Sequence, residues 1–363
     1  MIDSSFAQPP RPLEPRWRET VDYAIAHQSA WSRDPATDAR SFGIHHLDDP
    51  PHNRLLGPVF ARGPASGMIA VDGRVVCSWG EPDAPDMTFS VTKTYLALTA
   101  GVAHDRGILP PLDEPVRCRL PGLGFDSAHN RRITWEHLLQ FTSEWQGSCF
   151  GVPDRIDRYR VAGFQPAPTE RGRKGDARAL ARPGTYWEYN DVRINQFSLA
   201  LMHLLRRPVP ELFAEAIATP LGLSSSWRWS GYDNAWFEID GRPMQSVPGG
   251  GHWGGGMRIS ARDQLRIAQM MLDDGRWNGR TVLSSEWLQR MRTPCDIAPF
   301  YGYFLWLNHG HRPIPAAEPD DFFAVGVGAQ VIWHSPRRRL VAAIRWLQLE
   351  AFDGLVACVD RAL

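Results

Sequence analysis

The sequence predicts an α+β fold in which both ends of the chain build one antiparallel β-sheet and the middle forms a mostly helical second lobe. Segments with strand character occur near residue 70 and again in the last 65 residues, whereas helical periodicity dominates between them. Such strands pair most simply in one antiparallel sheet with helices on its faces. We expect a sheet domain of residues 1–110 and 240–363, a helical domain of residues 111–239, and a functional site at their interface.

The composition is that of a soluble globular protein, with 43% hydrophobic residues, 22% charged residues and a net charge of zero. This balance gives no reason to expect nucleic acid or an anionic membrane as a partner. The five cysteines form no C-x-x-C pair and are expected to be reduced thiols. Met1–Pro15 lacks the features of a secretory signal, and no apolar run is long enough to span a bilayer. We expect a cytoplasmic protein with a small-molecule partner and leave its oligomeric state open.

The first elements are a helix and a β-hairpin. Val21, Ala24 and Ile25 recur at helical spacing and predict a surface-packed helix between Trp17 and Gln28. Two β-prone runs, 68–71 and 74–79, then flank Asp72-Gly73, a pair that favours a type I′ turn between antiparallel strands.

Helices dominate from there to residue 218. The first begins at Ser90 and ends near Gly107, and another begins at Thr134, whose hydroxyl is suited to cap it. His137, on the body of that helix, is interpreted as a packed or capping histidine. Two apolar helices follow at 194–205 and 212–218, the second stopped by Pro220.

The segment 151–182 between these helices carries eight basic and four acidic side chains and much Gly and Pro. It is either a solvated loop or a basic lid over the site. Its charge is a weak indication of an anionic substrate.

The end of the chain returns to strands after a glycine-rich turn. Residues 248–257 lack the order of a phosphate-binding loop, and their small side chains instead allow the backbone to approach another group closely. A helix follows at 261–273. After it we expect four strands, at 301–307, 322–329, 330–334 and 340–347. A helix at 351–363 closes the chain.

Ser90 and Lys93 are the first candidates for chemistry. Their spacing puts the hydroxyl and the amine on one face of a helix, one turn apart. A serine alcohol is a weak nucleophile and needs a base beside it, and a lysine serves as that base only when it loses its proton. Lys93 and Lys174 are the only lysines in the chain, and the other 38 of its 40 basic residues are arginines, which cannot lose a proton in a protein.

Three pieces follow one another in a specific order: Ser90-x-x-Lys93, Tyr189-Asn190-Asp191, and the late segment Ala324-Val325-Gly326-Val327-Gly328. With the helix of Ile133–Ser143 between the first two, this order resembles the serine β-lactamase and penicillin-binding protein superfamily. It is most similar to the class C branch with its β-lactamase-like esterases and 6-aminohexanoate-oligomer hydrolases. The resemblance extends over residues 68–347.

The resemblance implies roles for matching residues. Ser90 would be the nucleophile that forms an acyl-enzyme, Lys93 the neighbouring base, and Tyr189 the residue that relays protons to the leaving group and activates water. The backbone N–H groups of Ser90 and Val327, with Gly326 beside them, would hold the oxyanion. No metal or organic cofactor is implied.

The chain also departs from the family pattern. Asp191 stands where the Y-x-N element has asparagine, which changes the charge beside the site, and Ala324-Val325-Gly326 replaces K-T-G. The lost lysine helps the lactamases and peptidases to recognise a substrate carboxylate, so its absence argues against efficient penicillin turnover. His252 and Trp253, in the glycine-rich turn, are expected on the wall of a substrate cleft.

We therefore expect a serine hydrolase that cleaves a small ester or amide through an acyl-enzyme, with Asp191, His252, Trp253, Gly326 and Val327 near the substrate. Activity like that of a β-lactamase or a D-Ala-D-Ala peptidase is the alternative within the same class. A non-catalytic binding protein on the same fold is the alternative from another class.

Overall fold

The computed structural model describes residue 6 and residues 13–167, 172–310 and 312–363. Two regions discussed above lie partly outside the described residues. One is Met1–Pro15, where no secretory signal is expected, and the other is residues 168–171 of the segment 151–182, which is called the basic loop below. Among the described residues, none of the helices combines the length and the apolar character needed to cross a bilayer.

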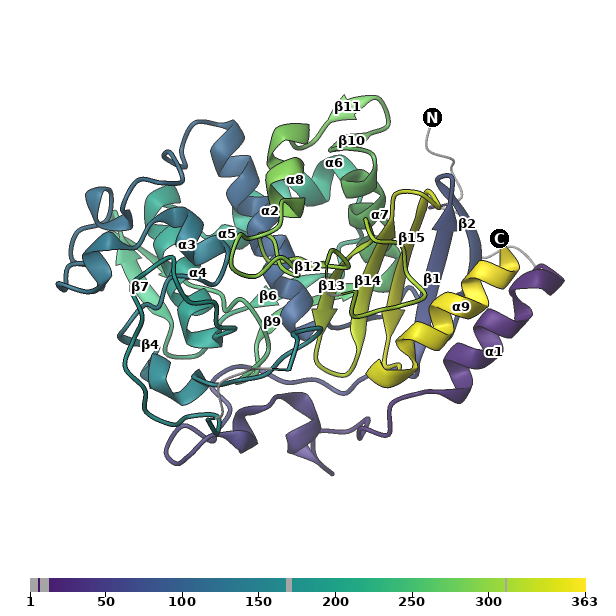
Figure 1. Ribbon diagram of the computed structural model, residues 1–363, viewed down its shortest axis with the longest axis horizontal. Helices are drawn as coiled ribbons and strands as arrows, with labels where there is room; N and C mark the ends of the chain where they lie inside the picture. The colour runs from purple at the N-terminus through teal and green to yellow at the C-terminus, as the bar shows by residue number, and fades with distance from the viewer. Residues whose placement is uncertain (1–5, 7–12, 168–171, 311) are drawn as a thin grey trace.

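A six-stranded antiparallel sheet forms one half of the molecule, in the order β12-β13-β14-β15-β1-β2 (Figure 1). Its strands are β1 (Ser66–Val71), β2 (Arg74–Trp79), β12 (Trp306–Leu307), β13 (Phe322–Gly326), β14 (Gln330–Ser335) and β15 (Leu340–Arg345). The strand β15 pairs with β1 and so joins the last strands of the chain to the first hairpin, with Ser66 opposite Arg345. The prediction of a sheet built from both ends of the chain is confirmed, whereas the exact domain boundaries stay a prediction.

The turn between β1 and β2 has the predicted geometry. Asp72 and Gly73 have φ angles of 48° and 71°, which are the two positive values that a type I′ turn requires. Asparagine, aspartate and glycine adopt this left-handed conformation at the lowest cost.

Helices cover both faces of the sheet. The helix α7 (Ala261–Leu272) packs on β1, β14 and β15. On the other face, α1 (Arg18–Ala26) and α9 (Phe352–Ala362) lie side by side (Figure 1). Phe352 of α9 packs edge-on against Phe323 and Trp333 of the sheet. The core therefore has three layers, with the sheet in the middle.

The helix α2 (Thr92–Asp105) runs between the sheet and the helical lobe, and its first 12 residues are buried. It contacts α4, α5 and α8. The remaining helices are α3 (Trp135–Leu139), α4 (Asp191–Leu205), α5 (Val209–Phe213), α6 (Thr219–Leu221) and α8 (Ser285–Arg292). Thr134 caps α3 in a capping box with His137, as the sequence predicts.

Short strands complete the structure. A three-stranded sheet has the order β3-β9-β6. Its strands are β3 (Pro85–Met87), β9 (Gly256–Ser260) and β6 (Arg228–Ser230), and the small hairpins are β4 (Ser148–Cys149) with β5 (Val152–Pro153), β7 (Trp236–Ile239) with β8 (Arg242–Gln245), and β10 (Arg276–Trp277) with β11 (Arg280–Thr281).

The structure differs from the prediction at residues 301–307 and at Pro220. Only Trp306–Leu307 of the expected strand 301–307 pairs in the sheet, because Gly302 N donates to Leu305 O and Phe304 turns into the left-handed region at φ 53°. Pro220 does not stop the helix at 218. The π-helical turn Ala214–Ala218 continues directly into α6, which contains Pro220, and the chain leaves the helix at Gly222 with a φ of 64°.

The turn conformation leads to a stability prediction. Gly73→Ala should lower the free energy of unfolding by about 1–2 kcal/mol, because nothing lies within 4 Å of the added Cβ and the cost is that of the left-handed backbone alone. Urea unfolding measures the difference. Asp72→Asn, which keeps a residue tolerant of this conformation, should have a smaller effect, and an equal loss in both variants would contradict the explanation.

Candidate active site

Ser90 lies in a tight turn at the start of α2. Residues Phe89–Val91 form a single 3₁₀ turn that continues directly into the helix. Phe89 has a φ of 48°, an uncommon value for a bulky residue, and its ring packs against Trp31 and Trp346 at centroid distances of 6.3 Å and 6.0 Å. Backbone strain held by surrounding packing is common beside functional residues.

Hydrogen bonds hold this turn against the start of β9. Thr88 Oγ1 donates to Met257 O at 2.9 Å, and Met257 N donates to Thr92 Oγ1 at 3.1 Å. The glycine-rich turn before β9 passes beside Ser90, so that a Cβ on Gly250 would lie 2.8 Å from Lys93 Nζ and 3.4 Å from Ser90 Oγ. The close approach expected of these small residues is thus observed, and the neighbour is the candidate site itself.

Ser90, Lys93 and Asp191 form a continuous chain of polar contacts. Lys93 Nζ donates to Ser90 Oγ at 2.9 Å and lies 2.5 Å from Asp191 Oδ1. All three side chains are at least nine-tenths buried. Lys93 Nζ thus bridges the candidate nucleophile and a buried carboxylate.

Tyr189 lies over the same amine, with its ring centroid 4.8 Å from Lys93 Nζ and 5.1 Å from the guanidinium carbon of Arg160. Its ring stacks on Trp306 and packs against Phe141, both from the walls of the lobe interface. Two positive charges therefore flank the phenol.

Asp191 belongs to a larger buried ion-pair network. Its Oδ2 atom pairs with Arg160 and lies 3.2 Å from His252 Nδ1. Arg160 Nη1 also contacts Asp157 Oδ2 at 3.1 Å. The network thus joins α4 to the basic loop and to the glycine-rich turn.

Asp48 extends the network to the N-terminal part of the chain. Its Oδ2 atom contacts His252 Nε2 and accepts a hydrogen bond from Trp253 Nε1, both at 2.9 Å. Its Oδ1 atom pairs with Lys174, whose Nζ also lies 3.2 Å from Asp157 Oδ1. Lys93, Arg160 and Lys174 thus balance three carboxylates.

Two carboxyl groups of this network, those of Asp191 and Asp157, have a lowered pKa. Burial acts to raise the pKa of Asp191, but the charges of Arg160 and Lys93 outweigh it and hold that pKa well below its usual range. Burial likewise acts to raise the pKa of Asp157, and Arg160 and Lys174 lower it overall. Their negative charges are therefore permanent at neutral pH.

Among the described residues, Asp157, Asp191 and His252 form the group whose ligand atoms could hold a metal ion, since these atoms lie within 4.8 Å of one another. Arg160 Nη1 already contacts all three side chains. The guanidinium supplies the positive charge that these acceptors need, so we assign them to the ion-pair network.

A cavity of about 710 Å³ opens beside Ser90. Tyr189, Gly326 and Val327 line it, and so do Arg160 and Lys174 of the basic loop. Gly326 passes so close to the serine turn that a Cβ there would clash with Thr88 O and lie 3.1 Å from Ser90 N. The end of β13 therefore lies directly against the backbone of the serine turn.

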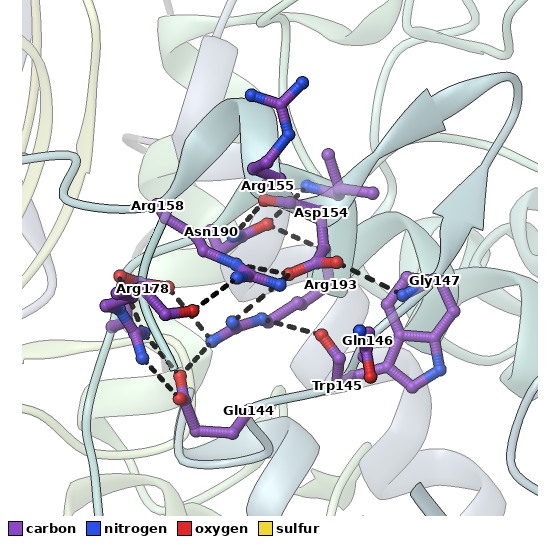
Figure 2. A network of polar contacts seen from close by, with 12 residues as sticks. Glu144, Trp145, Gln146, Gly147, Asp154, Arg155, Arg158, Arg178, Asn190 and Arg193 are labelled. Atoms are coloured by element: carbon purple, nitrogen blue, oxygen red, sulfur yellow. Dashed lines mark hydrogen bonds and ion pairs between the residues drawn. The ribbon is translucent and has the colours of Figure 1, made fainter. Parts of the chain in front are cut away.

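A second buried network fixes the start of α4, which carries Asp191 (Figure 2). Arg193 pairs with Glu144 at 2.7 Å and with Glu188 at 3.2 Å. Asn190 caps the helix through Oδ1 and donates from Nδ2 to Asp154 O at 3.0 Å. These contacts set the positions of both residues that flank Asn190, Tyr189 and Asp191.

The structure brings most of the predicted residues together. Lys93 contacts Ser90, Asp191 and the ring of Tyr189. Gly326 and Val327 line the cavity together with Ser90 and Tyr189. His252 meets this group from behind, through Asp191. Trp253 is fully buried and donates to Asp48, so its ring packs behind the site and stacks on His252 at 3.7 Å.

Sequence reasoning missed Asp48, Asp157, Arg160 and Lys174 as members of the network. Two signals pointed to them. Lys174 is the second of two lysines in an arginine-rich chain, and Asp157 and Arg160 form an i, i+3 pair inside the basic loop. Asp48 carried no such signal, because its partners come from distant parts of the chain.

The serine, lysine and tyrosine thus converge beside a cavity between a sheet and a helical lobe. The family model described as Beta-lactamase matches residues 61–348. The chain belongs to the β-lactamase family. A comparison with curated protein sequences gave no match.

Solved structures of β-lactamase-fold proteins share this architecture at low sequence identity. A penicillin-binding protein homologue from Caulobacter crescentus is 14% identical, with a TM-score of 0.61 over 98% of this chain and 99% of the other. EstCE1, a hydrolase with promiscuous acyltransferase activity, is 16% identical, with a TM-score of 0.60 over 98% of both chains. A protein from Bacillus anthracis, provisionally assigned as a 6-aminohexanoate-dimer hydrolase, is 14% identical, with a TM-score of 0.58 over 82% and 78%. The family and these neighbours support a hydrolase.

The network leads to a prediction for Asp191→Asn. This change removes the buried carboxylate that pairs with Lys93 and Arg160. At pH 7 it should lower the free energy of unfolding by about 3–5 kcal/mol. Because the folded pKa of Asp191 lies below its unfolded value, its contribution is complete above that unfolded value and declines as the pH falls through the folded pKa.

The difference between wild type and variant should therefore be largest near neutral pH and shrink below about pH 4. Urea unfolding monitored at several pH values measures it. Asp320→Asn, at an exposed carboxylate paired with Arg337, is the control and should change little. A difference for Asp191→Asn that grows on acidification would contradict the ionised network.

Proposed function

We propose that the protein is a serine hydrolase that cleaves small esters or amides through an acyl-enzyme on Ser90. The observation that carries this proposal is the 2.9 Å contact between Lys93 Nζ and Ser90 Oγ at the wall of the 710 Å³ cavity. A nucleophile in contact with an amine beside a space of substrate size is the arrangement that acyl transfer needs.

In the first step, Ser90 Oγ attacks the substrate carbonyl carbon and loses its proton as the new C–O bond forms. Lys93, paired with Asp191, stabilises the negative charge that develops on the serine oxygen. We assign Tyr189 to take this proton as a phenolate, which thereby becomes the neutral phenol. Lys93 and Arg160 flank its ring and would balance the phenolate charge before the transfer. The proton then passes to the leaving alcohol or amine as the old bond breaks.

In the second step, water attacks the acyl-enzyme, gives a proton to Tyr189 and releases the acid, while the proton returns to Ser90 Oγ. In both steps the carbonyl oxygen becomes an oxyanion. We assign its stabilisation to the N–H groups of Ser90 and Val327, because β13 ends directly beside the serine turn. Each such donor typically contributes about 3 kcal/mol to the transition state.

The alternative within this class is hydrolysis of β-lactams or D-alanyl peptides, which carry a carboxylate. The position of the family's strand lysine is occupied by Ala324, which is buried. Arg160 and Lys174 face the cavity, but both are already paired with carboxylates. These features favour a substrate without a carboxylate.

The decisive experiment compares wild type with Ser90→Ala. With p-nitrophenyl butyrate, kcat should fall by about three orders of magnitude or more, and labelling by a fluorophosphonate should disappear. Ser198→Ala, at a buried serine on α4, is the control and should keep both signals. Equal labelling or turnover in Ser90→Ala would favour the binding-protein alternative.

The oxyanion assignment has its own test in Gly326→Ala. The added Cβ would push the end of β13 away from Thr88 and Ser90, and we expect kcat to fall by about 10²–10³ with the fold retained. Circular dichroism checks the fold. Gly73→Ala, the same substitution in the turn at the other side of the sheet, should leave kcat unchanged, and wild-type kcat in Gly326→Ala would exclude the assignment.

A further inference from the structure

One wall of the cavity comes from a segment outside the family-model match. The match begins at residue 61, whereas Ser29, Ala30, Trp31, Ile44 and Leu47 all line the cavity. This segment, residues 29–47, is here called the N-terminal wall. A substrate held at Ser90 can contact this wall, because Ser90 lines the same cavity.

The N-terminal wall is mostly apolar and faces other apolar side chains. Val161, Val327 and Leu347 line the cavity together with it. Leu47 and Val161 are 59% and 56% exposed, although both belong to the cavity wall. Large apolar side chains left open to solvent at a cavity indicate a binding surface for an apolar group.

The wall is also firmly positioned. Asp48, the residue after Leu47, is fixed by His252, Trp253 and Lys174. Trp31 packs against Phe89, the residue before Ser90, and against Trp346. A subsite held by the same network as the nucleophile keeps a constant distance from it, which specificity requires.

The charges at this cavity do not favour an anion. Arg160 and Lys174 line it, but Asp191, Asp157 and Asp48 neutralise them. Glu350 is exposed on the wall and adds a negative charge. The cations of the basic loop at this cavity thus form internal ion pairs. They give no support to the anionic substrate that the composition of the loop indicates.

We propose that the N-terminal wall, residues 29–47, is a subsite for an uncharged hydrocarbon part of the substrate, held against Trp31, Ile44 and Leu47. The inference rests on the proposed hydrolase function and names the substrate class of that site. The hydrocarbon belongs either to the acyl group or to the alcohol, and both present the same surface to the wall. Each methylene buried there should raise kcat/KM by about fourfold until the cavity is filled.

The experiment measures kcat/KM in two series. The acyl series is p-nitrophenyl acetate, butyrate and hexanoate, and the alcohol series is ethyl, butyl and hexyl acetate followed by acid release. We expect a rise of at least tenfold from the shortest to the longest member of one series. Leu47→Ser, at a side chain exposed enough to tolerate the change, should reduce this ratio at least threefold, and Trp31→Ala should reduce it further.

Ile25→Ser is the matched control, because Ile25 is an apolar residue of α1 that is 52% exposed and does not line the cavity. It should leave the ratio unchanged. Flat profiles in both series, or a ratio that Leu47→Ser and Trp31→Ala leave intact, would overturn the subsite while Ser90-dependent turnover still supported the hydrolase. Loss of Ser90 dependence would instead overturn the proposed function.

A p-nitrophenyl ester with a terminal carboxylate should react more slowly than the neutral ester of equal length. A faster reaction of the charged ester would also overturn the proposed subsite.

Discussion

The contact between Lys93 and Asp191 is the interaction on which the site depends. It places the amine on the serine hydroxyl and at the same time gives it a permanent negative neighbour. An asparagine at this position would orient the lysine without adding a charge. Because the chain has aspartate, further cations are needed to keep the buried site close to neutral, and Arg160 supplies the first of them.

This requirement explains why the site recruits distant segments. Arg160 and Lys174 come from the basic loop, His252 from the glycine-rich turn, and Asp48 from the N-terminal part of the chain. Each ion that enters a buried network calls for another of opposite sign, since an unpaired buried charge is costly. The result is a site in which the nucleophile, the cavity wall and the lobe interface share one set of ion pairs.

Local patterns were sufficient to predict most elements of the main sheet, the hairpin turn and the serine–lysine pair. Asp72-Gly73 and the capping pair Thr134 and His137 act within a few residues, so their sequence signals are complete. The ion-pair network could not be predicted in this way, because Asp48 and His252 are partners across 204 positions. The prediction of a strand at 301–307 was wrong for a related reason. Tyr301 packs against the aromatic rings of Trp187 and Trp306 rather than in the sheet, and no local pattern distinguishes these two environments.

The order of strands in the main sheet has a consequence for synthesis. The strand β15 lies between β14 and β1, although it is the last strand of the chain to leave the ribosome. Until it emerges, the edge of β1 that β15 later covers is unpaired. The hairpin of β1 and β2 is complete at Trp79, whereas β15 begins only at Leu340, so this edge stays open for most of the chain's translation.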